Sequence, residues 1–251
     1  MSSNQKLAQD LMTSLELSLP PIAISFCKTV PPGISAFEGT VPAGCSFWQK
    51  AATRTFVTSA KDHELCVIGV HTHNLSPRSP SYPTEMQDVL KAMSGLDYVR
   101  EEEAAAIPVV RREVTHVLYG PLADCPAESD VVLLFAQARQ GLILSEAAAR
   151  VDKGSPSAMG RPACAVVPEV LNRGLAATSL GCCGARAYLD ALSDSVALWA
   201  FPGSKLEQYC AEILTLARAN KTLTTFHARR REDIEAGKKP TVRQSLDRLS
   251  S

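Results

Sequence analysis

The 251-residue sequence has no excess of charge of either sign, because 26 lysines and arginines are matched by 26 aspartates and glutamates. Proteins that bind nucleic acids or anionic membrane surfaces depend on a basic excess, so no partner of either class is expected. The sequence also lacks the ~18 to 20 successive apolar residues that a membrane-spanning helix needs. Its N-terminus lacks the charged-then-apolar order of a signal peptide. We therefore expect a cytoplasmic protein.

Several sequence motifs of known chemistry are also missing. Nothing matches a phosphate-binding loop or a dinucleotide fingerprint, since the glycine-rich segment 181–184 has no lysine and lacks the required spacing. The Gly-x-Ser-x-Gly motif of hydrolases is absent as well. No linker rich in proline, glycine or serine divides the chain, which predicts one globular domain over residues 1–225. Residues 226–251 are charged and poor in apolar residues, so we expect a tail that is ordered weakly or only by a partner.

The pattern of apolar residues predicts an α/β or α+β fold with a mixed central sheet flanked by helices. Val131 to Phe135 is a continuous apolar run of the kind found in a strand buried on both faces. Leu65 to Val70 is interpreted as another strand. Residues 76–83 contain three prolines and three serines and are expected to form an irregular loop that acts as a lid.

Eight cysteines are unusual in a chain long enough to bury a core without disulfides. In a reducing compartment they are expected to be thiols or metal ligands. Four of them lie beside glycine or proline at predicted loop edges, where the backbone can approach a metal: Cys45, Cys66, Cys164 and Cys182. The other four are interpreted as incidental: Cys27, Cys125, Cys183 and Cys210.

Four thiolates suit tetrahedral zinc or an iron-sulfur cluster. Zinc and ferredoxin-like sites usually contain Cys-x-x-Cys pairs, and none occurs here, so the alternative that these cysteines only pack in loops remains open. Structural zinc typically braces small folds that lack a core, and this chain is long enough to have one. We therefore favour a cluster over zinc.

A possible internal repeat links the same four cysteines. Cys45 is followed by an apolar helical stretch, a strand and Cys66, and Cys164 is followed by a similar order that ends at Cys182. The spacings are 21 and 18 residues. If the two halves are related, pseudo-symmetry brings the four thiols together.

Three histidines and two arginines lie close to these cysteines in the sequence: His63, His71, His73, Arg161 and Arg186. The imidazoles are candidates for metal ligands, a proton shuttle or the base of a cysteine nucleophile. The alternative is that they end a strand and bond to backbone. The guanidinium groups are candidates to offset the charge of a thiolate site or to clamp a carboxylate or phosphate, and the alternative is a surface ion pair.

Five short motifs together resemble domain-of-unknown-function family 169, an uncharacterised prokaryotic family. These motifs are Cys45-Ser-Phe-Trp, Asp62-His63-x-x-Cys66-x-Ile-Gly, Pro121-Leu after Tyr119, Gly160-Arg-Pro-Ala-Cys164 and Ser179-Leu-Gly-Cys182-x-Gly-x-Arg186. The likeness spans roughly residues 7 to 215. It implies kinship and no particular reaction. Because the motifs are built around the four selected cysteines, the resemblance strengthens the expectation that these cysteines form one four-thiolate site.

These observations predict a protein that binds an iron-sulfur cluster of the 4Fe-4S type and has a redox or cluster-assisted role on a small molecule. A thiol-based enzyme is the first alternative, with Cys66 or Cys182 as nucleophile and His63 or His73 as base. A binding protein for a tetrapyrrole, with a histidine or cysteine as axial ligand, is the second. A small-molecule ligand or redox partner is expected, and a homodimer is possible.

Overall fold

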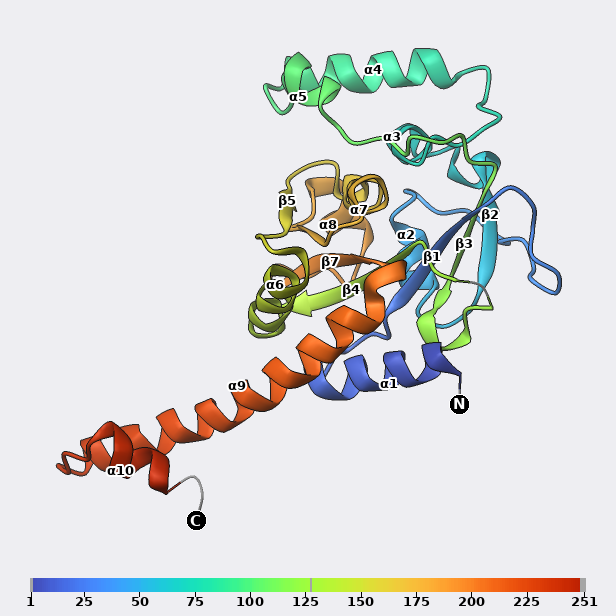
Figure 1. The fold of residues 1–251 in the computed structure, drawn as a ribbon. Coiled ribbons are helices and arrows are strands. Elements are labelled where there is room, and N and C mark those ends of the chain that lie inside the picture. Colours follow the sequence, from blue (N-terminus) through green and yellow to red (C-terminus); the bar gives the residue numbers. More distant parts are fainter. Residues whose placement is uncertain (1, 127, 249–251) are drawn as a thin grey trace.

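The computed structural model describes residues 2–126 and 128–248 of the chain. A single mixed sheet of seven strands runs through it in the order β2-β3-β1-β4-β7-β6-β5, with helices on both faces (Figure 1). The expectation of an α/β fold with a mixed sheet flanked by helices is therefore confirmed. No helix in the described part of the chain is long and apolar enough to cross a membrane.

The strands are β1 (Ile22–Cys27), β2 (Phe56–Ser59), β3 (His116–Pro121), β4 (Val131–Gln137), β5 (Ser157–Met159), β6 (Ala177–Ser179) and β7 (Val196–Pro202). The α-helices are α1 (Ser3–Leu15), α2 (Ser46–Lys50), α3 (Val67–Thr72), α4 (Tyr82–Gly95), α5 (Glu101–Ala105), α6 (Ala138–Asp152), α7 (Val166–Arg173), α8 (Cys183–Tyr188), α9 (Leu206–Glu235) and α10 (Val242–Asp247). Short 3₁₀ turns are η1 (Ala60–His63), η2 (Leu122–Asp124), η3 (Ala163–Ala165) and η4 (Gly203–Lys205).

The sheet consists of two similar halves that meet where β1 pairs with β4. From this centre outward the order is β1, β3, β2 on one side and β4, β7, β6 on the other, and every one of these pairs is antiparallel. In each half a short helix leads into the outermost of these three strands, α2 before β2 and α7 before β6, and β5 adds a parallel strand beyond β6. A second short helix then follows, α3 or α8. This order of strands and helices agrees with the internal repeat suggested by the cysteine spacing.

The two faces of the sheet pack against different sets of helices, because successive strand residues point to opposite sides. In β4, Val131, Leu133 and Phe135 belong to the apolar core that includes α2 and α7. Residues Val132 and Leu134 belong to the core formed with α1, α6 and α9. The cysteine-bearing helices therefore share the first face.

The strand expected at Leu65 to Val70 is wrong, because α3 occupies Val67–Thr72. Its buried side chains include Val67 and Val70, three positions apart, which is helical spacing. A short apolar run does not distinguish a strand from a buried helix by its periodicity, and here tertiary packing decides. The segment that follows, residues 76–81, is irregular, and α4 begins at Tyr82.

Helices α4 and α5 form a separate layer above the sheet (Figure 1). We call residues 82–107 the lid. Neither helix contains a buried residue. The lid is therefore held by few contacts and lies over the face that bears α2, α3, α7 and α8.

Helix α9 begins on the body and ends away from it. Its buried residues include Tyr209, Cys210 and Ile213, which pack in the core with α1 and α6. Asn220 and Lys221 still line a surface pocket with Ser14 and Glu16 at the end of α1. Further along, the helix projects from the body, and α10 folds back along it (Figure 1). The domain boundary expected at residue 225 lies within this continuous helix. We call residues 218–248 the arm.

Candidate functional site

The four selected cysteines occupy corresponding places in the two halves of the sheet. Cys45 directly precedes α2, and Cys164 lies in the 3₁₀ turn that leads into α7. Cys66 and Cys182 are the N-terminal caps of the six-residue helices α3 and α8. Each half thus contributes one thiol before the strand β2 or β6 and one after it.

All four cysteines line one cavity of about 270 Å³ beneath the lid. The lid contributes Val89, Leu90, Met93, Tyr98, Val99 and Ile107 to its wall. Arg161 is the one charged side chain among the described lining residues. The cavity is therefore an apolar space with thiols at its base and a single guanidinium group.

Two of these thiols are held strongly in the protonated form. Burial raises the pKa of Cys45 to about 12, and negative charge on Cys66 or Cys182 raises it further in the same direction. Burial raises the pKa of Cys164 well above its usual value, with charge on Cys66 as the next cause. The Cys164 sulfur accepts a hydrogen bond from the Thr72 hydroxyl at 3.4 Å. The four sulfurs therefore lie within electrostatic range of one another.

His63 is buried below Cys66 with one ring nitrogen unpaired. Its Nε2 lies 3.1 Å from Thr58 Oγ1, and that hydroxyl donates to the carbonyl oxygen of Val117. The Nε2–H therefore donates to Thr58, and Nδ1 carries a lone pair with no hydrogen-bond partner among the described residues. Burial lowers the pKa of His63, so the ring is neutral.

The glycines that flank the cysteines are needed for this packing. A Cβ on Gly44 would lie 2.9 Å from Nδ1 of His63, which is too close. A Cβ on Gly69 would lie 3.1 Å from the Cys66 sulfur and 3.6 Å from the same Nδ1. The glycines next to Cys45 and after Cys66 thus allow the two segments to close over the histidine.

His71 and His73 lie apart from the cavity wall. His73 Nδ1 donates to the carbonyl oxygen of Gly69 at 3.1 Å, and burial lowers its pKa to about 4. Its Nε2 has no partner within the described residues. His71 is half-buried, and its Nδ1 lies 3.1 Å from the hydroxyl of Tyr82, the first residue of α4. His71 therefore connects α3 to the lid.

The two predicted arginines have different roles. Arg161 lines the cavity, lies 4.2 Å from the Tyr98 ring centroid and approaches the carboxylate of Glu103 at 3.7 Å. Arg186 does not line it. Its guanidinium group donates to the carbonyl oxygens of Leu180, Leu192, Ser193 and Val196 and so braces the loops around α8. Arg161 alone is available to a ligand.

Some cavity residues were not recognised from the sequence. None of residues 76–81 lines the cavity, and the cover is the helical lid that follows them. Cys183, taken as incidental, lines it beside Tyr98, and a hydrogen bond to Cys183 raises the pKa of that tyrosine.

Tyr119 is fully buried, and its hydroxyl has no hydrogen-bond partner within the described residues. Burial, then charge on Cys164, Cys66 and Cys45, raises the Tyr119 pKa, so its hydroxyl lies near three of the thiols. No spacing rule could have placed it there.

A family model described as "Uncharacterised ArCR", domain-of-unknown-function family 169, matches residues 10–212. The chain belongs to domain-of-unknown-function family 169. The resemblance carried by the five motifs is thereby confirmed. No curated protein and no solved structure matches this chain. The family-169 region contains all four cysteines and the lid, and it ends within α9, before the arm.

The side-chain arrangement in this family-169 protein does not suit a single bound ion. No group of three or more histidine, cysteine, aspartate or glutamate side chains in residues 2–126 and 128–248 is placed so that it could hold one metal ion. Four sulfurs around one zinc, at Zn–S ≈ 2.3 Å, would lie about 3.8 Å apart. Cys27, Cys125 and Cys210 do not line the cavity.

Proposed function

We propose that this protein binds a 4Fe-4S cluster through Cys45, Cys66, Cys164 and Cys182 and has a redox or cluster-assisted role on a small molecule held in the cavity above them. The observation that carries the proposal is that thiols from four separate segments line one cavity. A cubane places iron and sulfide between its ligands, so its thiolates stand further apart than those around one zinc ion.

Unpaired polar groups around the thiols support the proposal. Among buried side-chain atoms without a hydrogen-bond partner in the described residues are Ser46 Oγ, His63 Nδ1 and Tyr119 Oη. Ser46 follows Cys45 in the chain. Negative charge on Cys164, Cys66 or Cys45 would raise the pKa of Tyr119, so its hydroxyl lies within electrostatic range of these three thiols. Leaving such a group unpaired in the interior costs about 1–3 kcal/mol. The hydroxyls are donors that could bond to ligating or bridging sulfur, an interaction that tunes such centres.

When bound, the cluster would supply one-electron transfer or an iron site that polarises a ligand. The chain itself would do three things. Cys45 and Cys164 would release the protons that burial holds on them, so loading would become weaker as the pH falls. The lid would exclude water from the centre. Arg161 would hold an anionic group at the cavity wall.

The cavity also indicates the class of small molecule. Its volume of about 270 Å³ lies just below the ≈ 300–1,000 Å³ range of small-molecule sites. Its walls are aliphatic and aromatic apart from the thiols and one guanidinium. We therefore infer a compact, mainly apolar ligand with one carboxylate or similar anionic group. A tetrapyrrole with a histidine axial ligand is a poorer fit, since neither His71 nor His73 lines the space.

Anaerobic reconstitution with iron and sulfide tests the proposal. We expect about four iron atoms per chain and broad absorbance near ~400 nm, as for thiolate-ligated clusters. Cys45→Ser and Cys164→Ser, one from each half, should each lose most of the iron and the absorbance. Cys210→Ser is the matched control, because Cys210 is buried in the opposite core, and it should load like the wild type.

Other outcomes would contradict the cluster. A colourless, iron-free protein after reconstitution rejects it. If thiol reactivity then depends on Cys66 or Cys182 alone, the thiol enzyme is favoured. A Soret band with an extractable macrocycle would indicate a tetrapyrrole, and one bound zinc per chain retained by the wild type and lost in both variants would indicate a zinc site.

A further inference from the structure

The neutral net charge of the chain conceals two regions of opposite sign. The arm, residues 218–248, contains nine lysines and arginines and four aspartates and glutamates, a net charge of +5. The lid, residues 82–107, contains two basic and six acidic residues, a net charge of −4. The charge therefore segregates onto the two most exposed parts of the molecule.

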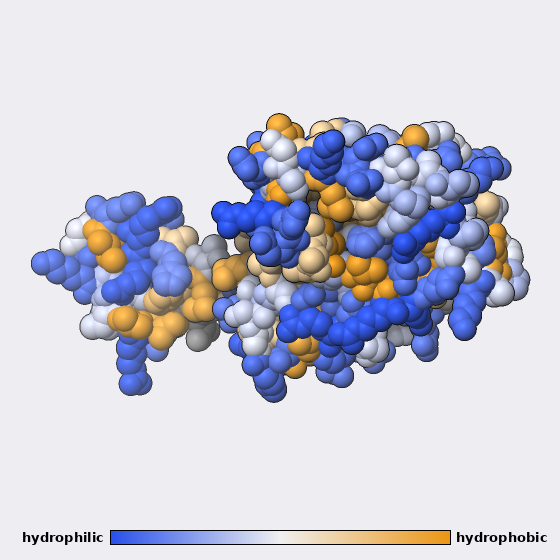
Figure 2. All heavy atoms as spheres, turned by 90° about the horizontal axis from the view of Figure 1, so that it is seen from above, coloured by the Kyte–Doolittle hydropathy of each residue, from blue (hydrophilic) through white to orange (hydrophobic). Residues whose placement is uncertain are grey.

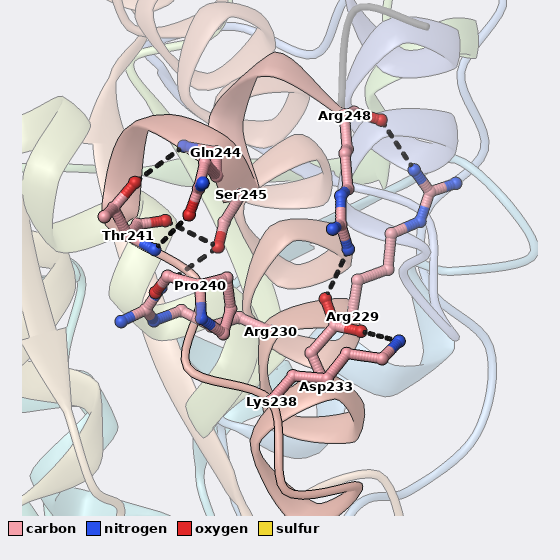
Figure 3. Close-up of polar contacts among 9 residues, drawn as sticks. All are labelled: Arg229, Arg230, Asp233, Lys238, Pro240, Thr241, Gln244, Ser245 and Arg248. Carbon is pink, nitrogen blue, oxygen red and sulfur yellow. Dashed lines mark hydrogen bonds and ion pairs between the residues drawn. The ribbon is translucent and has the colours of Figure 1, made fainter.

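The arm is an ordered helical hairpin. Asp233 of α9 pairs with Lys238 in the turn and with Arg248 after α10, at 2.8 and 2.6 Å (Figure 3). Arg230 of α9 donates to the carbonyl oxygen of Pro240 and to the hydroxyl of Ser245 in α10. These contacts fix α10 against α9. The arm thus presents a defined surface to a partner.

That surface combines apolar and basic side chains. Leu223, Ile234, Val242 and Leu246 are exposed large hydrophobic residues of the arm. Figure 2 shows the arm as a separate lobe on which hydrophobic atoms lie among hydrophilic ones. The side chains of Lys221, Lys239 and Arg243 have no hydrogen-bond or ion-pair partner in the described residues. Exposed apolar side chains on the same segment as unpaired charge are typical of an interaction surface.

The lid has complementary properties. Its acidic residues Asp88, Glu101 and Glu102 are exposed, and so is Leu96, at 76%. By length, α4 spans about 21 Å and residues 218–235 of α9 about 27 Å, at ≈ 1.5 Å per residue. The two helices can therefore lie along one another over the whole of α4.

Within one chain this pairing does not form. Figure 1 shows the arm extending from the opposite side of the sheet, away from the lid of its own chain. We propose that the arm of one copy lies against the lid of a second copy, and that the two copies exchange arms about a two-fold axis. Each lid is then covered by the partner's arm, which closes the roof over the cysteine cavity. The proposal does not depend on what the cysteines bind.

Sedimentation or light scattering of the full chain tests this arrangement. We expect a species of twice the 26.9 kDa chain mass at low ionic strength. It should dissociate toward the monomer in ~1 M salt, where the Debye length falls to about 3 Å. Two variants are expected to be monomeric: Lys221→Glu/Lys239→Glu/Arg243→Glu in the arm, and Asp88→Lys/Glu101→Lys/Glu102→Lys in the lid. None of these three basic residues has an ion pair to lose among residues 2–126 and 128–248.

Mixing the two monomeric variants is the decisive step. In the mixture a reversed arm meets a reversed lid, and a native arm meets a native lid, so we expect a heterodimer with wild-type mass. Circular dichroism that matches the wild type shows that each variant is folded. A monomeric wild type, or a mixture that stays monomeric while both variants are folded, overturns the proposal. So does a wild-type dimer that both triple variants retain. A monomer whose arm binds nucleic acid or anionic vesicles, with the binding lost in the arm variant, also overturns it.

Discussion

The two halves of the sheet carry matching pairs of cysteines in different surroundings. Two positions after its first cysteine, the N-terminal half has Phe47 and the C-terminal half has Val166. Phe47 packs against a cluster of rings that includes His63 and Tyr119, at centroid distances of 4.6 and 5.6 Å. The C-terminal half, residues 131–202, has no histidine. The thiols therefore follow the repeat, and the groups that surround them do not.

The difference shows how a symmetric ligand set can lie in an asymmetric environment. The unpaired buried atoms close to the thiols belong to the N-terminal half, at Ser46, His63 and Tyr119. The C-terminal half contributes Arg161 to the wall and uses Arg186 to brace its own backbone. The cation thus lies on the cavity wall itself, whereas the neutral polar groups are buried behind the thiols and do not line the cavity.

Truncating corresponding core residues would test this difference most strongly. Phe47→Ala should lower the free energy of unfolding by about 3–5 kcal/mol, because it leaves a cavity among several rings. Val166→Ala should cost about 2 kcal/mol, since fewer buried atoms are removed. Denaturant unfolding of the metal-free variants measures both. Equal losses would show that the aromatic cluster adds nothing to the N-terminal half.

Acid should destabilise the N-terminal half through its histidines. The folded-state pKa of His73 is about 4 against an ordinary value of 6.5, so the unfolded chain takes up a proton that the folded chain excludes. Stability is therefore retained above pH 6.5 and lost as the pH falls from 6.5 toward 4, by up to about 3 kcal/mol for this residue. Burial of His63 acts in the same direction.

Unfolding of the metal-free protein across pH 4–7 checks this window. His73→Gln should flatten the dependence. His227→Gln, at an exposed position of α9, is the control and should keep the wild-type slope. An unchanged slope in His73→Gln would contradict the assignment.

The smallest expected effect concerns the contact between the lid and the C-terminal half. Arg161 and Glu103 are both partly exposed, so Glu103→Gln should change the free energy of unfolding by less than about 1 kcal/mol. Alkylation of the cavity thiols should become at most about fivefold faster, because the lid opens more often. Glu102→Gln, one residue away and without a pairing to Arg161, should leave the rate unchanged. A faster rate in both variants would show that the pair does not hold the lid.

Local patterns were sufficient for much of the fold and for the choice of the cysteines. The apolar run of β4 and the turn residues around each cysteine are short-range signals. The similar order of elements in the two halves was suggested by the spacing of the cysteines. The segment at α3 was misassigned because six residues do not distinguish a buried helix from a strand. Tyr119 and Cys183 were missed because their proximity to the thiols depends on contacts between distant segments.

Sequence by itself determined the family and the neutral total charge of this protein, and it singled out the four cysteines that line the cavity. Tertiary structure alone decided that the four thiols share one cavity, that a weakly packed lid roofs it, and that Arg186 holds backbone while Arg161 faces the cavity. It also revealed that the neutral charge separates into a basic arm and an acidic lid. The physical reason is that composition and spacing are local properties, whereas burial, desolvation and charge proximity arise only when distant segments pack together.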